Sequence, residues 1–289
     1  MSITINTNVT SLVVQKNLNA AQSQLDTSIE RMTTGYKINS AKDDAAGLSI
    51  ATNLATKIRG SEQAQSNIQQ AGNLLSTAEG DITNISSQID RIRELSVQAA
   101  NGVNSTESMT AIKKEVEARV AEINKIAASS EFNGVSLLNG SGTLASNGLR
   151  LQIGSDSEAA TNSISITGVF GNAAATAIGL VGSSATFSTV SAAFANSSTA
   201  AQFIADCDSA LSDLTTRRTL IGAYQNRLDS TFDALDTSIE NLSSSKSTIM
   251  DTDVASESST YTKAQILQQA AASLLASANQ TPSIALSLI

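Results

Sequence analysis

The sequence predicts a mainly α-helical protein. Long helices from both chain ends would form an antiparallel bundle, a coiled-coil rod, with a small β-containing central domain. Apolar residues recur every three or four positions along both ends, which is the pattern of helices that bury one stripe against partner helices. Proline costs about 3 kcal/mol inside a helix, and the chain contains only Pro282. The middle has a different texture, because residues 159–205 contain no Asp, Glu, Lys or Arg.

The N-terminal end predicts two helices, over residues 3–36 and 41–100. Gly35 would stop the first, since glycine tolerates the left-handed conformation that ends many helices. Ser40 would cap the second, with Asp43 completing a capping box, and this helix would be about 90 Å long. Its internal glycines each cost about 1 kcal/mol relative to alanine, so we expect bends or close helix contacts at some of them. The seam of this helix includes Ile82, Ile85, Ile89 and Ile92.

The middle of the chain predicts a third helix followed by short strands. The helix covers residues 106–129, and the dipeptide Asn133-Gly134 after it is a turn signal. Apolar and polar residues alternate over residues 149–153 and 164–166, which is the two-residue period of strands.

The C-terminal end predicts two more long helices after a short one near residues 188–196. One runs from about Thr199 towards Ser245, and the last covers residues 253–278 before Pro282 ends it. We expect the two chain ends side by side, the middle displayed at the tip and both termini together at the other end. The seam of the longer helix includes Leu228, Phe232, Leu235, Ile239 and Leu242.

Composition argues against an enzyme and against nucleic acid as a partner. The net charge is −8, and no basic cluster is present to neutralise phosphates. The chain contains no histidine and a single cysteine, so it lacks the commonest general base, the commonest metal ligand and any intrachain disulfide. We predict no cofactor and no metal, and we expect Cys207 to be a small buried residue of the seam.

Neither a membrane segment nor a metal site is indicated. No stretch approaches the roughly 20 apolar residues of a membrane helix, and residues 1–15 lack the features of a signal peptide. We expect a cytoplasmic protein, or one that leaves the cell without a cleavable signal. Asp43-Asp44 is one acidic group, and Asp251, Asp253 and Glu257 form another. Both are better explained as helix starts, because carboxylates in a first turn favour the helix dipole.

Several motifs at both ends resemble those of bacterial flagellin. The most specific is RMTTGYKINSAKDDAAGL at residues 31–48, and RIRELSVQ at residues 91–98 follows at the expected distance. Near the C-terminus, LIGAYQNRL at residues 220–228 and ANQ at residues 278–280 also match. The resemblance covers about residues 1–140 and 200–289 and does not extend to the middle.

The resemblance implies a structural subunit, not an enzyme, that polymerises into the extracellular filament of the bacterial flagellum for swimming motility. The subunit would be exported unfolded by the flagellar type III system. Its implied partners are further copies of itself, an export chaperone bound through the C-terminal helices, the filament cap and the hook-junction proteins. In this family the terminal helices order only when they are stacked in the filament, since isolated helices with thin apolar stripes are marginal in water.

The resemblance also implies a division into five segments. Residues 1–40 and 251–289 would be inner-core helices, and residues 41–140 and 200–250 would be the two halves of a helical rod domain. Residues 141–199 would form a variable, solvent-facing, β-containing segment. The inner-core helices would polymerise through large aliphatic residues, namely Leu12, Leu18, Leu25, Ile29, Ile266, Leu267, Leu274 and Leu275.

Flagellins are also ligands of the innate immune receptor Toll-like receptor 5. The resemblance implies receptor contacts from Arg91, Leu95 and Glu115, which occupy the positions of the family's contact residues. Asp90 precedes Arg91 where the family commonly has Gln, a departure that concerns receptor affinity and not filament formation.

A hook–filament junction protein is the alternative interpretation, because it shares the terminal heptads. Such relatives usually lack the continuation at residues 45–48 and the ending at residues 278–280. An inserted metallopeptidase would need a His-Glu-x-x-His motif, which a chain without histidine cannot supply. A free-standing coiled-coil adhesin would explain the seams but not the set of motifs.

Overall fold

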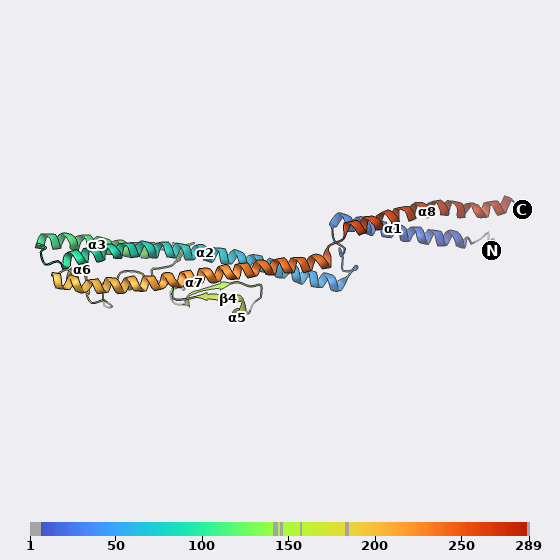
Figure 1. The fold of residues 1–289 in the computed structure, drawn as a ribbon. Coiled ribbons are helices and arrows are strands. Elements are labelled where there is room, and N and C mark those ends of the chain that lie inside the picture. The colour runs from blue at the N-terminus through green and yellow to red at the C-terminus, as the bar shows by residue number, and fades with distance from the viewer. Residues whose placement is uncertain (1–6, 141–143, 145–146, 157, 183–184, 288–289) are drawn as a thin grey trace. The chain divides into compact units, whose positions relative to one another are not determined.

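The computed structural model describes residues 7–287 apart from 141–143, 145–146, 157 and 183–184. The chain divides into two compact units, which we call the terminal unit (residues 1–58 and 240–289) and the central unit (residues 59–239). Helices dominate both units, which confirms the predicted mainly α class, and the described strands are short and lie in the central unit (Figure 1). The five-segment division stays a prediction.

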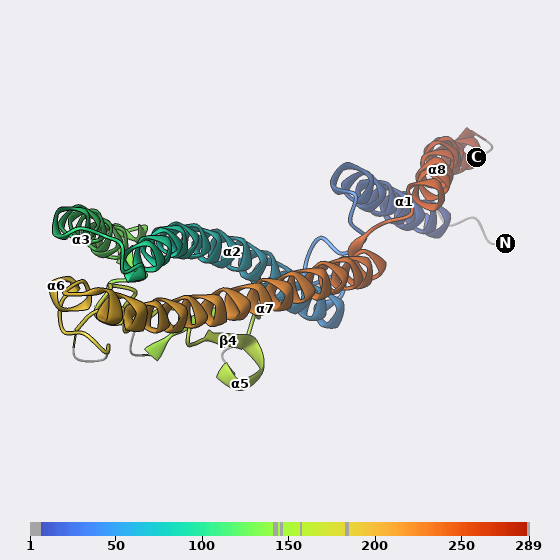
Figure 2. The same cartoon turned by 60° about the vertical axis from the view of Figure 1, so that its left-hand side comes forward.

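In the terminal unit, α1 (Val9–Thr34) and α8 (Val254–Ser287) run antiparallel, side by side, in both Figure 1 and Figure 2. Asn8 caps α1, because its side-chain oxygen accepts the Ser11 N–H at 3.1 Å. Gly35 follows the last residue of α1 in the left-handed conformation, with φ of 76°. The predicted stop is therefore confirmed.

The long helix α2 (Ala45–Ala100) begins four residues later than predicted, at 45 and not 41. Asp44, not Ser40, caps it, since the Asp44 carboxylate accepts the Gly47 N–H at 2.9 Å. Asp43 turns back to the preceding loop and accepts hydrogen bonds from the Ser40 hydroxyl and N–H, both at 2.9 Å. These bonds lower the pKa of Asp43, because they favour the ionised carboxylate.

The prediction that Pro282 ends the last helix is wrong, because α8 continues to Ser287. Proline lacks the N–H that would bond the carbonyl four residues earlier. That carbonyl belongs to Ala278, and it accepts a hydrogen bond from the Asn8 side-chain amide at 2.7 Å. The donor that proline removes is replaced from outside the helix.

In the central unit, α2, α3 (Thr106–Ser129) and α7 (Ser197–Met250) pack around one hydrophobic core, and α2 and α7 run antiparallel (Figures 1 and 2). The predicted seam of α2 is completely buried at Ile82, Ile85, Ile89 and Ile92. The inward face of α3 consists of Ile112, Val116, Val120, Ile123 and Ala127. In the predicted seam of α7, Leu228 is buried, and the half-buried members are Phe232, Leu235, Ile239 and Leu242.

Two short antiparallel hairpins follow α3. β1 (Glu131–Phe132) pairs with β2 (Val135–Ser136) across Asn133-Gly134, whose φ angles of 51° and 76° suit a tight hairpin turn. β3 (Leu149–Gln152) pairs with β4 (Ser163–Ile166), where the alternating pattern predicts strands. The first hairpin is too short to show alternation, so only its turn is predicted by the sequence.

The short helices α5 (Ala159–Asn162) and α6 (Val190–Ala193) lie in residues 141–199, which we call the middle segment. α6 lies within the range predicted for a short helix. Thr189 caps it, since its hydroxyl accepts the Ala192 N–H at 3.2 Å.

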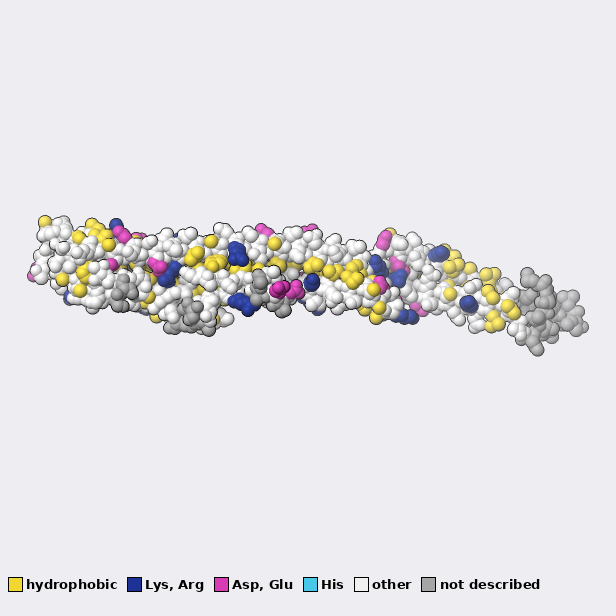
Figure 3. Space-filling model, turned by 90° about the horizontal axis from the view of Figure 1, so that it is seen from below, with side chains coloured by type: hydrophobic (Ala, Val, Ile, Leu, Met, Phe, Trp, Pro, Cys, Tyr) yellow, Lys and Arg dark blue, Asp and Glu magenta, His cyan; other side chains and the backbone are white. Residues whose placement is uncertain are grey.

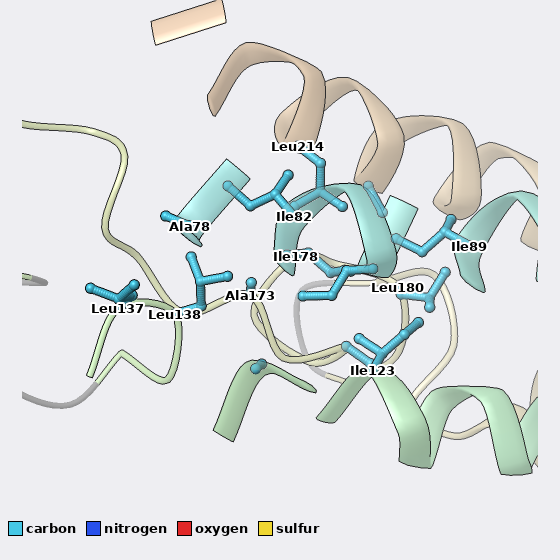
Figure 4. Close-up of a cluster of buried hydrophobic side chains, with 14 of the residues drawn as sticks. Ala78, Ile82, Ile89, Ile123, Leu137, Leu138, Ala173, Ile178, Leu180 and Leu214 are labelled. Carbon is cyan, nitrogen blue, oxygen red and sulfur yellow. The ribbon is translucent and has the colours of Figure 1, made fainter. Parts of the chain in front are cut away.

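The middle segment packs into the core of the helices. Figure 4 shows Ile178 and Leu180 in one buried cluster with Ile82 of α2 and Leu214 of α7. The expectation that the middle is displayed at the tip is wrong for these residues. Burying a charged side chain is costly unless it is paired, which explains why the stretch that enters this core lacks charges.

Polar side chains of the helices satisfy backbone groups of the middle segment. Arg217 of α7 donates to the carbonyls of Gly171 and Asn172 at 3.1 and 3.3 Å. The side-chain oxygen of Asn124 in α3 accepts the Ala175 N–H at 2.9 Å. An irregular segment can be buried only where its backbone groups find partners, so these side chains hold the segment in place.

Gly60 of α2 allows the loop around Ser155 to pack closely against the helix. A Cβ added at Gly60 would lie 2.6 Å from the Ser155 Cβ, so a side chain there would displace the loop. At Gly72 and Gly80, nothing lies within 4 Å of such an atom. The close contact at Gly60 is with a loop and not with another helix, so the expected close helix contact is not found at this glycine.

Leu180→Ala should lower the free energy of unfolding of the whole central unit. Leu180 is completely buried, and such a truncation costs about 2–5 kcal/mol through lost burial and the cavity that remains. Urea unfolding of the full chain, followed by helical circular dichroism, measures the effect. Val103→Ala is the control, because Val103 is 84% exposed. An unshifted helical transition in Leu180→Ala would mean that the middle segment folds independently of the helices.

Candidate assembly and recognition surfaces

Small residues form the contact between α1 and α8. The buried positions of the two helices are Ala21, Ser28, Glu257, Ala264 and Ala271. They recur at intervals of seven residues within each helix, which is the spacing of a coiled-coil seam. Small side chains bring the two helices close together, but they bury little apolar surface.

The larger residues predicted for this seam behave differently. Leu18, Leu25 and Leu275 are half-buried beside the small residues. The other five stay exposed, namely Leu12, Ile29, Ile266, Leu267 and Leu274. Figure 3 shows hydrophobic side chains exposed over the outer part of the paired helices, while charged side chains gather over their inner part. Exposed apolar patches of this kind mark interaction surfaces.

A buried polar cluster crosses the α1–α8 seam. The Ser28 hydroxyl donates to Glu257 Oε1 at 2.5 Å, and Arg31 Nη1 lies 3.7 Å from Glu257 Oε2. A carboxylate is buried at acceptable cost only when it is paired and hydrogen-bonded, so this cluster favours one register of the two helices. Sequence patterns miss it, because Ser28 and Glu257 lie 229 positions apart.

Backbone hydrogen bonds join the two segments next to this pair. The Lys37 N–H donates to the Met250 carbonyl at 2.7 Å, and the Thr252 N–H donates to the Gly35 carbonyl at 2.9 Å. Asp253 then caps α8, since its side-chain oxygen accepts the Ala255 N–H at 2.9 Å. The interpretation as a helix start is therefore confirmed for Asp253, while Glu257 in the first turn also belongs to the polar cluster of the seam.

The described residues contain no group of three His, Cys, Asp or Glu side chains that could hold a metal ion. Among the helices of the same residues, none is both long enough and apolar enough to cross a membrane.

Comparison with known proteins identifies the family. Residues 5–143 match the Bacterial flagellin N-terminal helical region, and residues 204–289 match the Bacterial flagellin C-terminal helical region. The chain belongs to the bacterial flagellin family. It is 37% identical over 276 residues to the flagellar filament 30.7 kDa core protein of Treponema maltophilum, with 95% of each chain covered. It is 33% identical over 375 residues to flagellin B of Vibrio cholerae, with both chains covered completely.

Among solved structures, the crystal structure of Bacillus cereus flagellin aligns with a TM-score of 0.48 and 26% identity, covering 59% of this chain and 88% of that one. Flagellins are structural proteins of the extracellular flagellar filament, and this flagellin is therefore a structural protein and not an enzyme.

Two of the three residues implied in receptor recognition meet on the surface of this flagellin. Arg91 Nε of α2 lies 3.3 Å from Glu115 Oε1 of α3, and Arg91 Nη1 lies 2.8 Å from Glu94 Oε2. Glu115 also accepts a hydrogen bond from Arg119 Nη2 at 3.1 Å. The hydrogen bond from Arg119, followed by the charge of Arg91, lowers the pKa of Glu115, so its carboxylate is held ionised.

The third residue lies elsewhere. The Leu95 side chain is 2% exposed and belongs to the hydrophobic core of the central unit. It offers almost no surface to a partner in this conformation, and its role in receptor recognition stays a prediction.

The single thiol is a core group, as the seam pattern predicts. Cys207 of α7 is completely buried, and its burial raises the pKa of the thiol to about 12. The thiolate is the reactive form, so the folded protein keeps this cysteine inert.

Alkylation with iodoacetamide should leave Cys207 unlabelled in the folded protein at pH 8 and label it completely in urea.

The raised pKa of Cys207 also makes the free energy of unfolding depend on pH. The folded state retains the thiol proton that the unfolded state releases, so stability is lost as pH rises from about 9 to about 12. Cys207→Ala should remove this part of the pH dependence. Rapid labelling of the folded chain would contradict the buried position.

Proposed function

We propose that this flagellin polymerises into the flagellar filament through the outward faces of α1 and α8. The observation that supports this most is the exposure of large aliphatic residues on both helices. Ile266 is 61% exposed and Leu274 is 59% exposed, although each has the spacing of a helix-packing residue. Copies of the same helices would cover these faces in the filament.

The energetics favour stacking over isolation. Complete burial of a leucine or isoleucine side chain contributes about 1.5–3 kcal/mol, whereas the small residues between α1 and α8 contribute much less. Most of the stabilisation available to the terminal unit therefore comes from neighbouring copies. Filament formation would bury these faces and stabilise the paired helices further.

The export route and the other partners belong to the same proposal. A single cysteine excludes an intrachain disulfide, which suits export of an unfolded chain by the flagellar type III system. The exposed apolar face of α8 offers a surface that an export chaperone would cover before assembly. The filament cap and the hook-junction proteins are the expected partners at the two ends of the polymer.

A hook–filament junction protein remains the alternative. The relatives of nearly equal length named as filament core proteins and flagellins support the filament subunit instead. Polymerisation of the purified chain into long filaments would distinguish the filament subunit from the junction protein, because a junction protein would need a partner to assemble.

Recognition by Toll-like receptor 5 is a second candidate function. The exposed pair of Arg91 and Glu115 supports it, because both groups are ionised and occupy the positions of the family's contact residues, Arg91 in the motif and Glu115 on the next helix. The buried side chain of Leu95 would contribute by positioning α2 and not by direct contact.

The intact chain, seeded with short filament fragments, should form long uniform filaments in negative-stain electron microscopy. A chain lacking residues 1–40 and 250–289 should not. Ile266→Gln with Leu274→Gln should raise the critical concentration at least about tenfold, because the filament would bury two fewer aliphatic side chains per subunit. The control Val103→Gln changes an exposed residue of the central unit and should assemble normally. A wild-type protein that stays soluble would favour the alternative that the chain is a hook–filament junction protein. Normal assembly of the double variant would show that the outward face of α8 is not the assembly surface.

Arg91→Ala and Glu115→Ala should each weaken activation of a Toll-like receptor 5 reporter cell about tenfold, since a hydrogen bond to a charged group contributes about 1.5–3 kcal/mol. Both variants should unfold at nearly the wild-type temperature, because exposed ion pairs contribute little stability. Arg93→Ala is the matched control, as Arg93 lies in the same motif but pairs with Asp208 at 2.6 Å. Full activation by Arg91→Ala and Glu115→Ala would exclude this site.

A further inference from the structure

Helix α8 contains a proline, Pro282, in its interior. Proline inside a helix leaves the carbonyl four residues earlier without its helical donor and usually breaks or kinks the helix. In α8 that carbonyl belongs to Ala278, yet the helix continues past Pro282 to Ser287. A donor from elsewhere would lower the cost of this continuation.

The Asn8 side chain supplies that donor. Its Nδ2 donates to the Ala278 carbonyl at 2.7 Å, across 270 positions of sequence. The Oδ1 of the same amide accepts the Ser11 N–H at 3.1 Å and the Thr10 hydroxyl at 2.6 Å. One side chain therefore caps the start of α1 with its oxygen and reaches α8 with its nitrogen.

A second contact holds the same register. The Ser11 hydroxyl donates to Asn279 Oδ1 at 2.9 Å, one residue after the carbonyl that Asn8 bonds. The first turn of α1 is thus tied at two adjacent positions to the part of α8 that precedes Pro282.

We propose that Asn8 is a positioning residue that makes the continuation of α8 through Pro282 depend on the docking of α1. With α1 in place, Asn8 satisfies the Ala278 carbonyl and the last turns of α8 are helical. Without α1, the helix ends at about residue 278, as the sequence of α8 by itself predicts. The proline thereby couples the two chain ends, so that neither reaches its full helical length alone. This inference concerns pairing within one subunit and goes beyond the proposed function.

Asn8→Asp isolates the proposed contact. Aspartate has almost the same shape and retains the oxygen that caps α1, but it replaces the donor to Ala278 with a second acceptor. Thr10→Ala is the matched control, since it removes a hydrogen bond to the same side chain without affecting the contact with α8. Pro282→Ala restores the helical N–H, so the Ala278 carbonyl no longer depends on Asn8.

The experiment measures amide hydrogen exchange over residues 279–287 in the full-length chain, for the wild type, Asn8→Asp, Pro282→Ala, the double variant and Thr10→Ala. Asn8→Asp should accelerate exchange about two- to tenfold, the factor that one hydrogen bond represents. The same change should have a clearly smaller effect in the Pro282→Ala background, and Thr10→Ala should leave the exchange of these residues unchanged.

Three results would overturn the proposal. The first is an amide exchange rate over residues 279–287 that Asn8→Asp leaves unchanged. The second is an equal effect of Asn8→Asp on that rate in the wild-type and Pro282→Ala backgrounds. The third is a wild type in which these amides are unprotected from exchange. The same comparison is made in seeded filaments and in the soluble chain. A wild type that never polymerises would count against the filament function, while the exchange rates in the soluble chain would still decide the coupling.

Discussion

The terminal unit depends on one constraint. Helices α1 and α8 each carry two apolar stripes, and a single pair of helices can bury only one stripe of each. The buried stripe consists of small residues such as Ala21, Ala264 and Ala271, while large residues such as Ile266 and Leu274 stay exposed. This arrangement leaves the largest hydrophobic side chains of the pair uncovered, which supports the proposal that other copies of the chain cover them. A subunit built in this way is completed by assembly.

In the central unit, segments of the same chain bury the large apolar residues of the helices. The seam isoleucines of α2 are covered by α3, by α7 and by the uncharged middle segment, so no second copy is needed to bury them. Arg217 and Asn124 satisfy backbone groups of that segment, which allows an irregular stretch to enter a hydrophobic core. The central unit therefore has the features of a stably folded domain, in contrast to the terminal unit.

Polar contacts select the register where small residues alone would not. Alanine-rich seams resemble each other at every seven-residue shift, so they define the register of two helices weakly. Glu257 with Ser28, and Asn8 with the Ala278 carbonyl, each have a partner in only one register. A shifted pair would leave a buried carboxylate or an orphaned carbonyl, and both are costly.

The sequence by itself determined the class of the fold, the long helices, the stop at Gly35, the second hairpin and the family. Periodicity, proline content and local turn chemistry act over a few residues, so they can be read along the chain. The tertiary structure decided the rest. Leu95 lies in the core, whereas Leu12 and Ile266 are exposed. The middle segment packs into the core between the helices, and α8 continues beyond Pro282. Each of these outcomes depends on groups far apart in sequence, such as Asn8 and Ala278. A pattern in one segment cannot show which distant segment will cover a stripe or supply a missing donor.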